Sequence, residues 1–357
     1  MAGQIGVAVL GCGYWGVNYV RVLSELPEVR VVVMCDQRAD RLEELASRFP
    51  AVGHTAQAEA ALCHPAVDAV VVCTNAAMHY PIAKRALAMG KHVLVEKPLT
   101  MASEQAEELI ELAETKSAVL LVGHTFVYNA GIRKVKEYVQ SGQDQVYYLY
   151  SSRTNLGPIR TDVNALWDLA PHDVAIFNYL LDSTPTWVSA VGVKILGNCR
   201  EDVGFVSLGY RGDRADIVGH IHVSWADPHK TRELVVVGSD RRVVFNDLNG
   251  IEQVRVFEKG IKATPEPLTY GEHRLQIRDG DIVSPKLEIS EPLKNQCRHF
   301  VDCITSGVTP VTNGRDGERV VRVLQAIDRS LSLHGTPVEV ANDPCSEDEW
   351  MESAVSA

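Results

Sequence analysis

The chain has 357 residues, and its 46 acidic and 35 basic residues give a formal net charge of −11. This length favours two domains, and a content of 46% hydrophobic and 23% charged residues is ordinary for a globular protein. Because a negative surface repels a phosphate backbone, the charge disfavours nucleic-acid binding as a main role.

The sequence contains no stretch of about 20 apolar residues, and its N-terminus lacks the basic region of a signal peptide. None of the eight cysteines forms a C-x-x-C pair, and several lie in apolar runs. The histidines are scattered without metal-ligand spacing. We therefore expect a cytoplasmic protein with free thiols, no metal, and no nucleic-acid or membrane partner.

The first third of the chain alternates short apolar runs with helical patterns. Strands are expected at residues 5–10, 29–35, 67–73, 92–95 and 119–122, and helices at 15–26, 38–49, 80–89 and 101–115. This alternation predicts an α/β fold with a doubly wound parallel sheet, that is, a Rossmann domain over residues 1–123.

After Gly123 the pattern changes to closely spaced strands. They are expected at residues 147–153, 186–196, 204–210, 216–225, 234–238, 242–246 and 252–257. Apolar and polar residues alternate over 217–224, which predicts an antiparallel sheet with one wetter face. A long loop over 259–290 and helices over 293–305 and 315–333 complete an α+β domain at 124–341, and residues 342–357 are expected to be a flexible tail.

A glycine motif opens the first expected helix. The run from Gly11 to Gly16 fits G-x-G-x-x-G, directly after a strand. Its glycines, Gly11, Gly13 and Gly16, permit a tight turn and close approach of a pyrophosphate, which the helix N-terminus stabilises. Tyr14 and Trp15, between these glycines, are expected to contact the same cofactor. A glycine-rich turn without a ligand is the alternative.

Asp36 ends the second strand, twenty residues beyond Gly16. A carboxylate at this place accepts hydrogen bonds from the ribose hydroxyls of NAD and repels the 2′-phosphate of NADP, so NAD is favoured, although Arg38 lies close by. Thr74, Asn75 and His79 follow the strand that starts at Val67, at the edge of the sheet where a cofactor binds. They are candidate cofactor contacts, with ordinary loop residues as the alternative.

Glu96-Lys97-Pro98 ends the strand that starts at His92, on the same side of the sheet. Glu96 and Lys97 are candidate cofactor contacts. A lysine in such a crevice can also hydrogen-bond a reacting hydroxyl, whereas an exposed lysine at a strand end is the simpler interpretation. Pro98 restricts Lys97 to an extended backbone and permits a cis bond.

A second candidate group is the Asp168/His172 pair. The two residues lie four apart, so their side chains share one face of a helix. Histidine exchanges a proton near neutral pH, and a carboxylate can orient it. Because Pro171 favours the first turn of a helix, Asp168 is alternatively an N-cap.

With the glycine motif at Gly11, Glu96-Lys97-Pro98 and the Asp168/His172 pair, the chain resembles the Gfo/Idh/MocA oxidoreductases over nearly its whole length. The resemblance implies an open-faced sheet in the second domain, through which such proteins form dimers or tetramers. It also implies NAD or NADP as the cofactor, with Lys97 and His172 beside the reacting alcohol carbon and Asp168 supporting them.

The stretch from Arg153 to Trp167 resembles the subgroup that acts on UDP-N-acetylglucosamine or its uronate. The two arginines can bind a carboxylate or diphosphate, with surface salt bridges as the alternative. The candidate substrate-binding residues are Asn129, Arg153, Asn155, Arg160, Asn164, Trp167 and His172. The run Tyr128-Asn129-Ala130-Gly131 departs from the family, in which many members have a proline.

The working hypothesis is an NAD-dependent dehydrogenase acting on a CH–OH group of a sugar, at C3 of a nucleotide-linked sugar. An inositol or free-sugar dehydrogenase and an NDP-ketosugar reductase use the same residues. A non-catalytic nucleotide-binding sensor is the alternative from another class, and the presence of both Lys97 and the Asp168/His172 pair argues against it.

Overall fold

The computed structural model describes residues 4–141, 145–197, 199–212, 215–263, 275–288 and 290–340. The tail predicted over 342–357 lies outside these residues. The chain folds into two compact units. The first contains the chain up to Asn129 and the segment Ile289–Val321, and the second contains Ala130–Glu288 and the chain from Arg322 onward.

The first unit contains a six-stranded parallel sheet in the order β3-β2-β1-β4-β5-β6. The strands are β1 (Ile5–Leu10), β2 (Val29–Cys35), β3 (Gly53–Thr55), β4 (Ala69–Val72), β5 (His92–Glu96) and β6 (Leu120–Gly123). The helices are α1 (Gly16–Ser24), α2 (Ala39–Arg48), α3 (Ala58–Leu62), α4 (Ala76–Ala88), α5 (Ser103–Thr115), the 3-10 turn η1 (Thr125–Tyr128) and α8 (Pro292–Ser306). The predicted doubly wound sheet is confirmed. Only the short β3, α3 and η1 escaped the periodicity analysis.

The helix α8 belongs to the first unit, whereas the predicted second domain ran without interruption from 124 to 341. The apolar side chains of Leu293, Cys297 and Phe300 recur at helical spacing and are buried in the hydrophobic core that β1 and α1 also build. Periodicity identifies an amphipathic helix but not the core that covers its apolar face, so the sequence could not place this helix.

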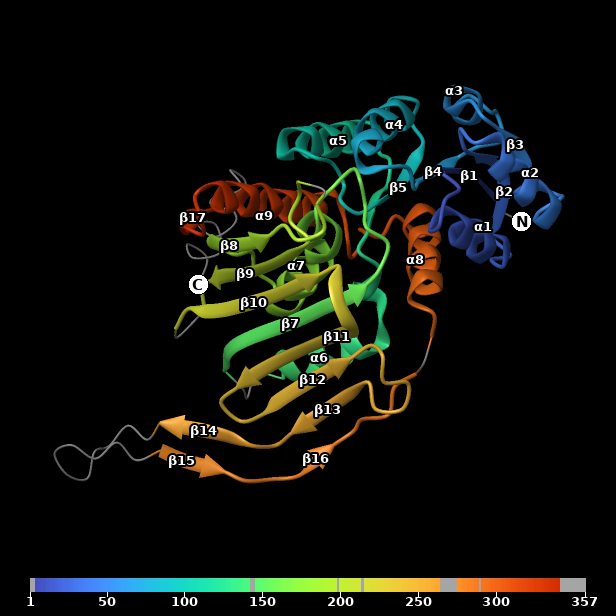
Figure 1. Ribbon diagram of the computed structural model, residues 1–357. Coiled ribbons are helices and arrows are strands. Elements are labelled where there is room, and N and C mark those ends of the chain that lie inside the picture. Colours follow the sequence, from blue (N-terminus) through green and yellow to red (C-terminus); the bar gives the residue numbers. More distant parts are fainter. Residues whose placement is uncertain are drawn as a thin grey trace, which may run out of the picture. The chain divides into compact units, whose positions relative to one another are not determined.

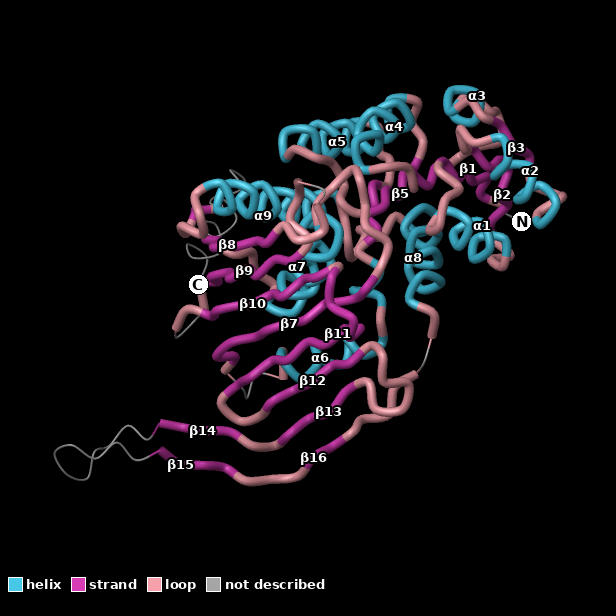
Figure 2. Tube along the Cα trace, viewed as in Figure 1, coloured by secondary structure: helices cyan, strands magenta, loops and turns pink. Residues whose placement is uncertain are grey.

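The second unit contains a nine-stranded sheet in the order β16-β13-β12-β11-β7-β10-β9-β8-β17. The strands are β7 (Val146–Leu156), β8 (Trp187–Val193), β9 (Val203–Tyr210), β10 (Ile217–Ser224), β11 (Ala226–Gly238), β12 (Arg242–Asn246), β13 (Val254–Phe257), β16 (Ile282–Val283) and β17 (Val338–Glu339). Figure 2 shows strands β8 to β13 side by side in one sheet. Neighbouring strands run antiparallel except β7 and β10, so the predicted mostly antiparallel sheet is confirmed.

Helices pack on one face of this sheet. α6 (Ala130–Val139) contacts β12 and β13, and α7 (Ala165–Leu181) contacts β7, β9 and β10 (Figure 1). The long helix α9 (Gly314–Ser332) begins in the first unit and ends in the second. In β10, Gly219, Ile221 and Val223 are buried and their neighbours are more exposed, as the period-two pattern predicts.

The loop predicted over residues 259–290 is wrong in part. Within it, β14 (Gly260–Ala263) pairs with β15 (Leu275–Arg278), and β16 pairs with β13. These strands are only two to four residues long. They therefore carry no alternation of apolar and polar residues from which pairing could be predicted.

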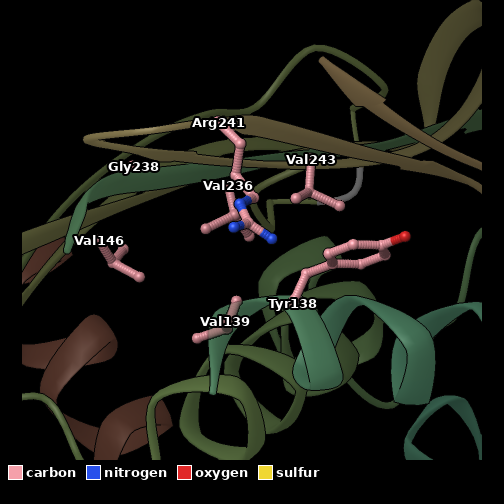
Figure 3. Close-up of a pocket in the computed structure, with 7 residues that line it drawn as sticks. All are labelled: Tyr138, Val139, Val146, Val236, Gly238, Arg241 and Val243. Carbon is pink, nitrogen blue, oxygen red and sulfur yellow. The ribbon is translucent and has the colours of Figure 1, made fainter. Parts of the chain in front are cut away.

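A small pocket opens between α6 and the sheet of the second unit (Figure 3). Its lining residues are Tyr138, Val139, Val146, Val236, Gly238, Arg241 and Val243. The guanidinium carbon of Arg241 lies 5.7 Å from the centre of the Tyr138 ring, which places a cation over an aromatic face. None of these residues is a predicted site residue.

Two predicted absences concern the described part of the chain. No helix there is both long and apolar enough to cross a membrane. The same residues contain no group of three or more His, Cys, Asp or Glu side chains arranged to hold a metal ion. The expected cytoplasmic location stays a prediction.

Candidate active site

In the glycine loop, two of the three motif glycines are required by close backbone contacts within the protein, and the third borders open space. Gly11 has φ +87°, and a Cβ there would lie 2.6 Å from the Cys73 backbone. A Cβ on Gly16 would lie 1.9 Å from the Gly11 carbonyl oxygen, whereas one on Gly13 would meet nothing within 4 Å. Gly11 and Gly16 therefore allow tight packing, and Gly13 borders open space before the N-terminus of α1. This arrangement fits the pyrophosphate of NAD, which a helix N-terminus stabilises.

Asp36, which follows β2, holds the glycine loop through a hydrogen bond. Its Oδ2 accepts a hydrogen bond from the Cys12 N–H at 2.9 Å, and its Oδ1 accepts from the Arg38 N–H at 3.0 Å and from Arg38 Nε at 3.2 Å. A carboxylate has about four acceptor positions, so capacity for a ribose hydroxyl remains. The Arg38 side chain is 58% exposed and brings a positive charge to the same place.

The residues predicted after β4 divide into two kinds. Asn75 is exposed at the N-terminus of α4 and Thr74 is half-buried beside it, so both keep surface toward a ligand. His79 is only 1% exposed, and its ring nitrogens lie 2.7 Å from the Pro98 carbonyl oxygen and 3.1 Å from that of Thr74. Burial between two backbone carbonyls gives His79 a structural role in place of the predicted cofactor contact.

Glu96 is the last residue of β5 and Lys97 follows it, and both side chains are buried. The Glu96 carboxylate accepts hydrogen bonds from the Tyr19 hydroxyl at 2.7 Å and from the Lys97 N–H at 3.1 Å. These contacts turn Glu96 toward the protein interior, which differs from its predicted role as a cofactor contact. The Lys97–Pro98 bond is cis, as the sequence allowed.

His124 lies next to Lys97 because Gly123 pairs with Glu96 in the parallel register of β5 and β6. The imidazole is 2% exposed, and among the described residues neither ring nitrogen has a hydrogen-bond partner. Burial, together with the charge of Lys97, lowers the pKa of His124 to about 3. A neutral imidazole therefore lies beside the predicted catalytic lysine, and the sequence analysis missed it.

The second unit carries the Asp168/His172 pair on α7. This helix begins after Asn164, whose Oδ1 accepts a hydrogen bond from the Trp167 N–H at 2.9 Å. Asn164 is therefore the N-cap, which corrects the alternative that Asp168 caps the helix, while the substrate role of Asn164 stays a prediction. Asp168 and the half-buried His172 lie one turn apart within α7.

Two side chains hold the Asp168 carboxylate. Arg160 Nη1 donates to Oδ1 at 3.1 Å, and the indole N–H of Trp225, at the end of β10, donates to Oδ2 at 3.2 Å. Arg160 also pairs with Asp162. The carboxylate, 17% exposed, is thus fixed in orientation one turn before His172.

Two predicted substrate residues have structural partners instead. Arg153 is 6% exposed, and its guanidinium donates two hydrogen bonds, at 2.8 and 3.1 Å, to Asp173. This matches the salt-bridge alternative, although the pair is buried rather than on the surface. Trp167 is buried, and its indole N–H donates to Asp328 at 2.8 Å.

The two remaining predicted amides differ in exposure. Asn129 is 5% exposed at the end of η1, in the first unit. Asn155 is half-buried near the end of β7, where its Nδ2 lies 1.7 Å from the position of a Cβ on Gly157. Gly157 therefore lets the Asn155 side chain fold over the backbone, and Asn155 is the better placed of the two for a ligand.

The first unit is a Rossmann fold with a glycine loop suited to a dinucleotide. The second unit has an open-faced sheet and carries the Asp168/His172 pair. Together these features define an NAD-dependent oxidoreductase that acts on CH–OH groups. Residues 5–124 match the model of an oxidoreductase family with an NAD-binding Rossmann fold. Residues 132–244 match the model of the GFO/IDH/MocA C-terminal domain. The chain belongs to the Gfo/Idh/MocA oxidoreductase family.

Several relatives have named activities. The chain is 30% identical, over 78% of its length and 85% of the relative's, to UDP-N-acetylglucosamine 3-dehydrogenase of Acidithiobacillus ferrooxidans. It is 24% identical to scyllo-inositol 2-dehydrogenase (NAD(+)) of Bacillus subtilis, over 95% of its length and 97% of the relative's. Among solved structures, GenD2 from gentamicin A biosynthesis in complex with NAD has a TM-score of 0.79, 27% identity, and coverage of 96% of this chain and 98% of its own.

Proposed function

We propose that the protein oxidises C3 of a nucleotide-linked sugar, UDP-N-acetylglucosamine or its uronate, with NAD. The similarity to UDP-N-acetylglucosamine 3-dehydrogenase supports this substrate class. The WlbA dehydrogenase of Bordetella pertussis, crystallised with NADH and UDP-GlcNAcA, has the same fold, with a TM-score of 0.78. The observation that carries the catalytic part is the fixed Asp168 carboxylate one turn from His172, in a chain that also buries Lys97 in the unit that contains the dinucleotide loop.

In the proposed mechanism, His172 removes the proton of the C3 hydroxyl, and Lys97 donates a hydrogen bond to the same oxygen. The negative charge of Asp168 stabilises the imidazolium that His172 becomes. Bound NAD would supply the acceptor for the hydride of C3, and loss of the hydroxyl proton and this hydride would leave a ketone at C3. The protein contributes alignment and proton transfer, which requires Lys97 and His172 to act on one carbon.

Several residues of the first unit would bind NAD. The backbone around Gly13 would receive the pyrophosphate, and Asp36 would accept a ribose hydroxyl. Thr74 and Asn75 would border the cofactor near the end of β4, with Tyr14 and Trp15 at the entry of α1. Tyr14 is 83% exposed and Trp15 is 45% exposed, so both offer aromatic surface to a ligand.

The direct test is the absorbance of NADH formed from NAD and a panel of substrates. The panel contains UDP-N-acetylglucosamine, its uronate, myo-inositol, scyllo-inositol and glucose. We expect NADH from one of the two UDP-sugars. Formation from an inositol alone would establish the second candidate, which the similarity to scyllo-inositol 2-dehydrogenase favours. NAD binding without turnover of any panel member, in either direction, would support the non-catalytic sensor.

The protein is also proposed to form a homodimer or homotetramer through the open face of its large sheet. Gly219 faces Phe177 of α7, so its neighbours Val218 and His220 face the other way. Tyr148 pairs with Val218 in register, and Phe205 stacks on His222 with ring centres 4.5 Å apart. Tyr148 and Val218 are 47% and 43% exposed, and such a row of apolar groups typically marks an interface.

The association is tested with Val218→Glu. A carboxylate in the middle of a buried interface lacks a partner, so we expect a monomer in size-exclusion chromatography with light scattering. Ile251→Glu is the matched control, because Ile251 is 94% exposed in the turn between β12 and β13. An unchanged mass for Val218→Glu would contradict the proposal.

A further inference from the structure

A chain of buried side chains runs through the first unit to the predicted catalytic lysine. Gln296 on α8 donates from Nε2 to the Tyr19 hydroxyl at 2.7 Å, and that hydroxyl donates to Glu96 Oε1 at 2.7 Å. Tyr19 and Gln296 are both 0% exposed. At the far end, Thr125 of η1 donates to Gln296 Oε1 at 2.8 Å.

The direction of every bond in this chain is determined. Burial, together with the nearby Glu96 carboxylate, raises the pKa of Tyr19 well above its ordinary value, so the phenol keeps its proton. It therefore donates to Glu96 and accepts from an amide N–H. That requirement turns the Gln296 amide so that its oxygen faces the Thr125 hydroxyl, which can donate.

The chain ends on the backbone of Lys97. One carboxylate oxygen of Glu96 is held by Tyr19, and the other accepts the Lys97 N–H at 3.1 Å. The carboxylate is enclosed from the side of β6 as well, because a Cβ on Gly123 would lie 3.1 Å from Oε1. Glu96 thus holds the peptide group from which the Lys97 side chain leaves the backbone.

We propose that Tyr19 and Gln296 are positioning residues for Lys97, acting through the Glu96 carboxylate. This inference rests on the proposed role of Lys97 in catalysis. Tyr19 lies in the helix whose N-terminus closes the dinucleotide loop, and Gln296 comes from a helix almost three hundred residues further along the chain. Without the hydroxyl of Tyr19, the Glu96 carboxylate can rotate away from the Lys97 peptide. The backbone position from which the lysine side chain extends is then no longer fixed.

The test is a double-mutant cycle between Tyr19→Phe and Lys97→Ala, measured as kcat with NAD and the UDP-sugar that the panel identifies. Tyr19→Phe keeps the ring and removes only the hydroxyl. We expect kcat to fall about tenfold, the effect of one buried hydrogen bond to a charged group, with the Kd for NAD unchanged within about twofold. The Kd is measured by quenching of intrinsic fluorescence. In the Lys97→Ala background the same substitution should change kcat by less than about twofold.

Two further variants keep the test informative if Tyr19→Phe folds poorly. Gln296→Leu should reproduce the loss of kcat and the coupling to Lys97, because it breaks the same chain one bond earlier. Tyr210→Phe is the matched control: this buried tyrosine donates its hydroxyl to Asn178 in the second unit, so its loss should leave kcat unchanged.

The outcomes separate this inference from the proposed function. An undiminished kcat for Lys97→Ala would refute the proposed function and the inference with it. If Lys97→Ala abolishes most activity, the inference alone is refuted by either of two results. One is an undiminished kcat in Tyr19→Phe, and the other is an equal loss from Tyr19→Phe in the wild-type and Lys97→Ala backgrounds.

Discussion

The two halves of the proposed site are built in different ways. In the first unit, the hydrogen-bond chain that leads to Lys97 contains residues of β5, α1, α8 and η1, and its bonds join residues 77 and 277 positions apart. In the second unit, Asp168 and its donor Arg160 lie eight positions apart, and its donor Trp225 lies 57 positions away. A local stretch of the sequence therefore contains Arg160, Asp168 and His172. For Lys97, the local motif contains only Glu96 and Lys97 of the hydrogen-bonded residues, and the residues that hold Glu96 come from distant parts of the chain.

The largest expected effect comes from removing either proposed catalytic group. Lys97→Ala and His172→Ala should each lower kcat by about a hundredfold to ten thousandfold, the usual contribution of a positioned acid, base or hydrogen-bond donor. The Kd for NAD should stay nearly unchanged, because neither side chain is needed for the glycine loop. Steady-state rates and fluorescence titration measure the two quantities, and wild-type turnover in either variant would remove that residue from the mechanism.

A smaller effect is expected from Asp168→Asn, which keeps the shape of the side chain and removes its charge. The imidazolium of His172 then loses its stabilising partner, and kcat should fall about tenfold to a hundredfold. Trp225→Phe removes the indole N–H that donates to Asp168 and should lower kcat less than Asp168→Asn does. Equal losses in the two variants would mean that packing of Trp225, rather than the orientation of Asp168, controls this half.

Asp36→Ala tests the cofactor end of the first unit. The substitution removes an acceptor for the ribose hydroxyls and the carboxylate that holds the Cys12 N–H, so the Kd for NAD should rise about tenfold or more. The positive charge of Arg38 is then no longer compensated, and the preference for NAD over NADP should decrease. A ratio of Kd values that stays constant would exclude Asp36 as the selecting residue.

The burial of His124 predicts that the free energy of unfolding depends on pH in the acidic range. The native imidazole stays neutral down to about pH 3, whereas the unfolded one has its ordinary pKa of 6.5. The unfolded state therefore binds more protons as the pH falls below about 6.5, and the free energy of unfolding should decrease by about 1.4 kcal/mol per pH unit from this group.

His124→Leu isolates this contribution from the titration of the carboxylates. Urea unfolding at several pH values between about 4 and 7, the range in which this linkage acts, gives a curve of unfolding free energy against pH for each protein. The difference between wild type and variant should shrink or reverse toward acid pH. Parallel curves would show that the imidazole is protonated in the native protein.

The residues that the sequence could place and those that it could not differ in the range of their contacts. Gly11, Gly13 and Gly16 are predictable because strand, turn and helix adjoin one another in the chain. The N-cap of α7 was not predictable in the same way. Pro171 suggested a helix that starts at Asp168, whereas Pro171 lies inside α7 and Asn164 is its N-cap.

The sequence also could not show which polar side chains are buried. Arg153 and Trp167 carry suitable groups for a ligand, but Asp173 and Asp328 use those groups inside the second unit. The buried Tyr19 and Gln296 had no local signal either, because a polar residue in an amphipathic helix gives no indication of a partner in another element. The register of β5 and β6, which the sequence does not give, is what brings His124 next to Lys97.

The central claim is that the two differently built halves act on one carbon. A crystal structure of the protein with NAD and the UDP-sugar that it turns over would measure it directly. We expect Lys97 Nζ and the His172 imidazole to lie within hydrogen-bond distance, about 3 Å, of the same substrate oxygen. A complex in which the substrate oxygen contacts only one of the two side chains, with the other far outside hydrogen-bond reach, would contradict it.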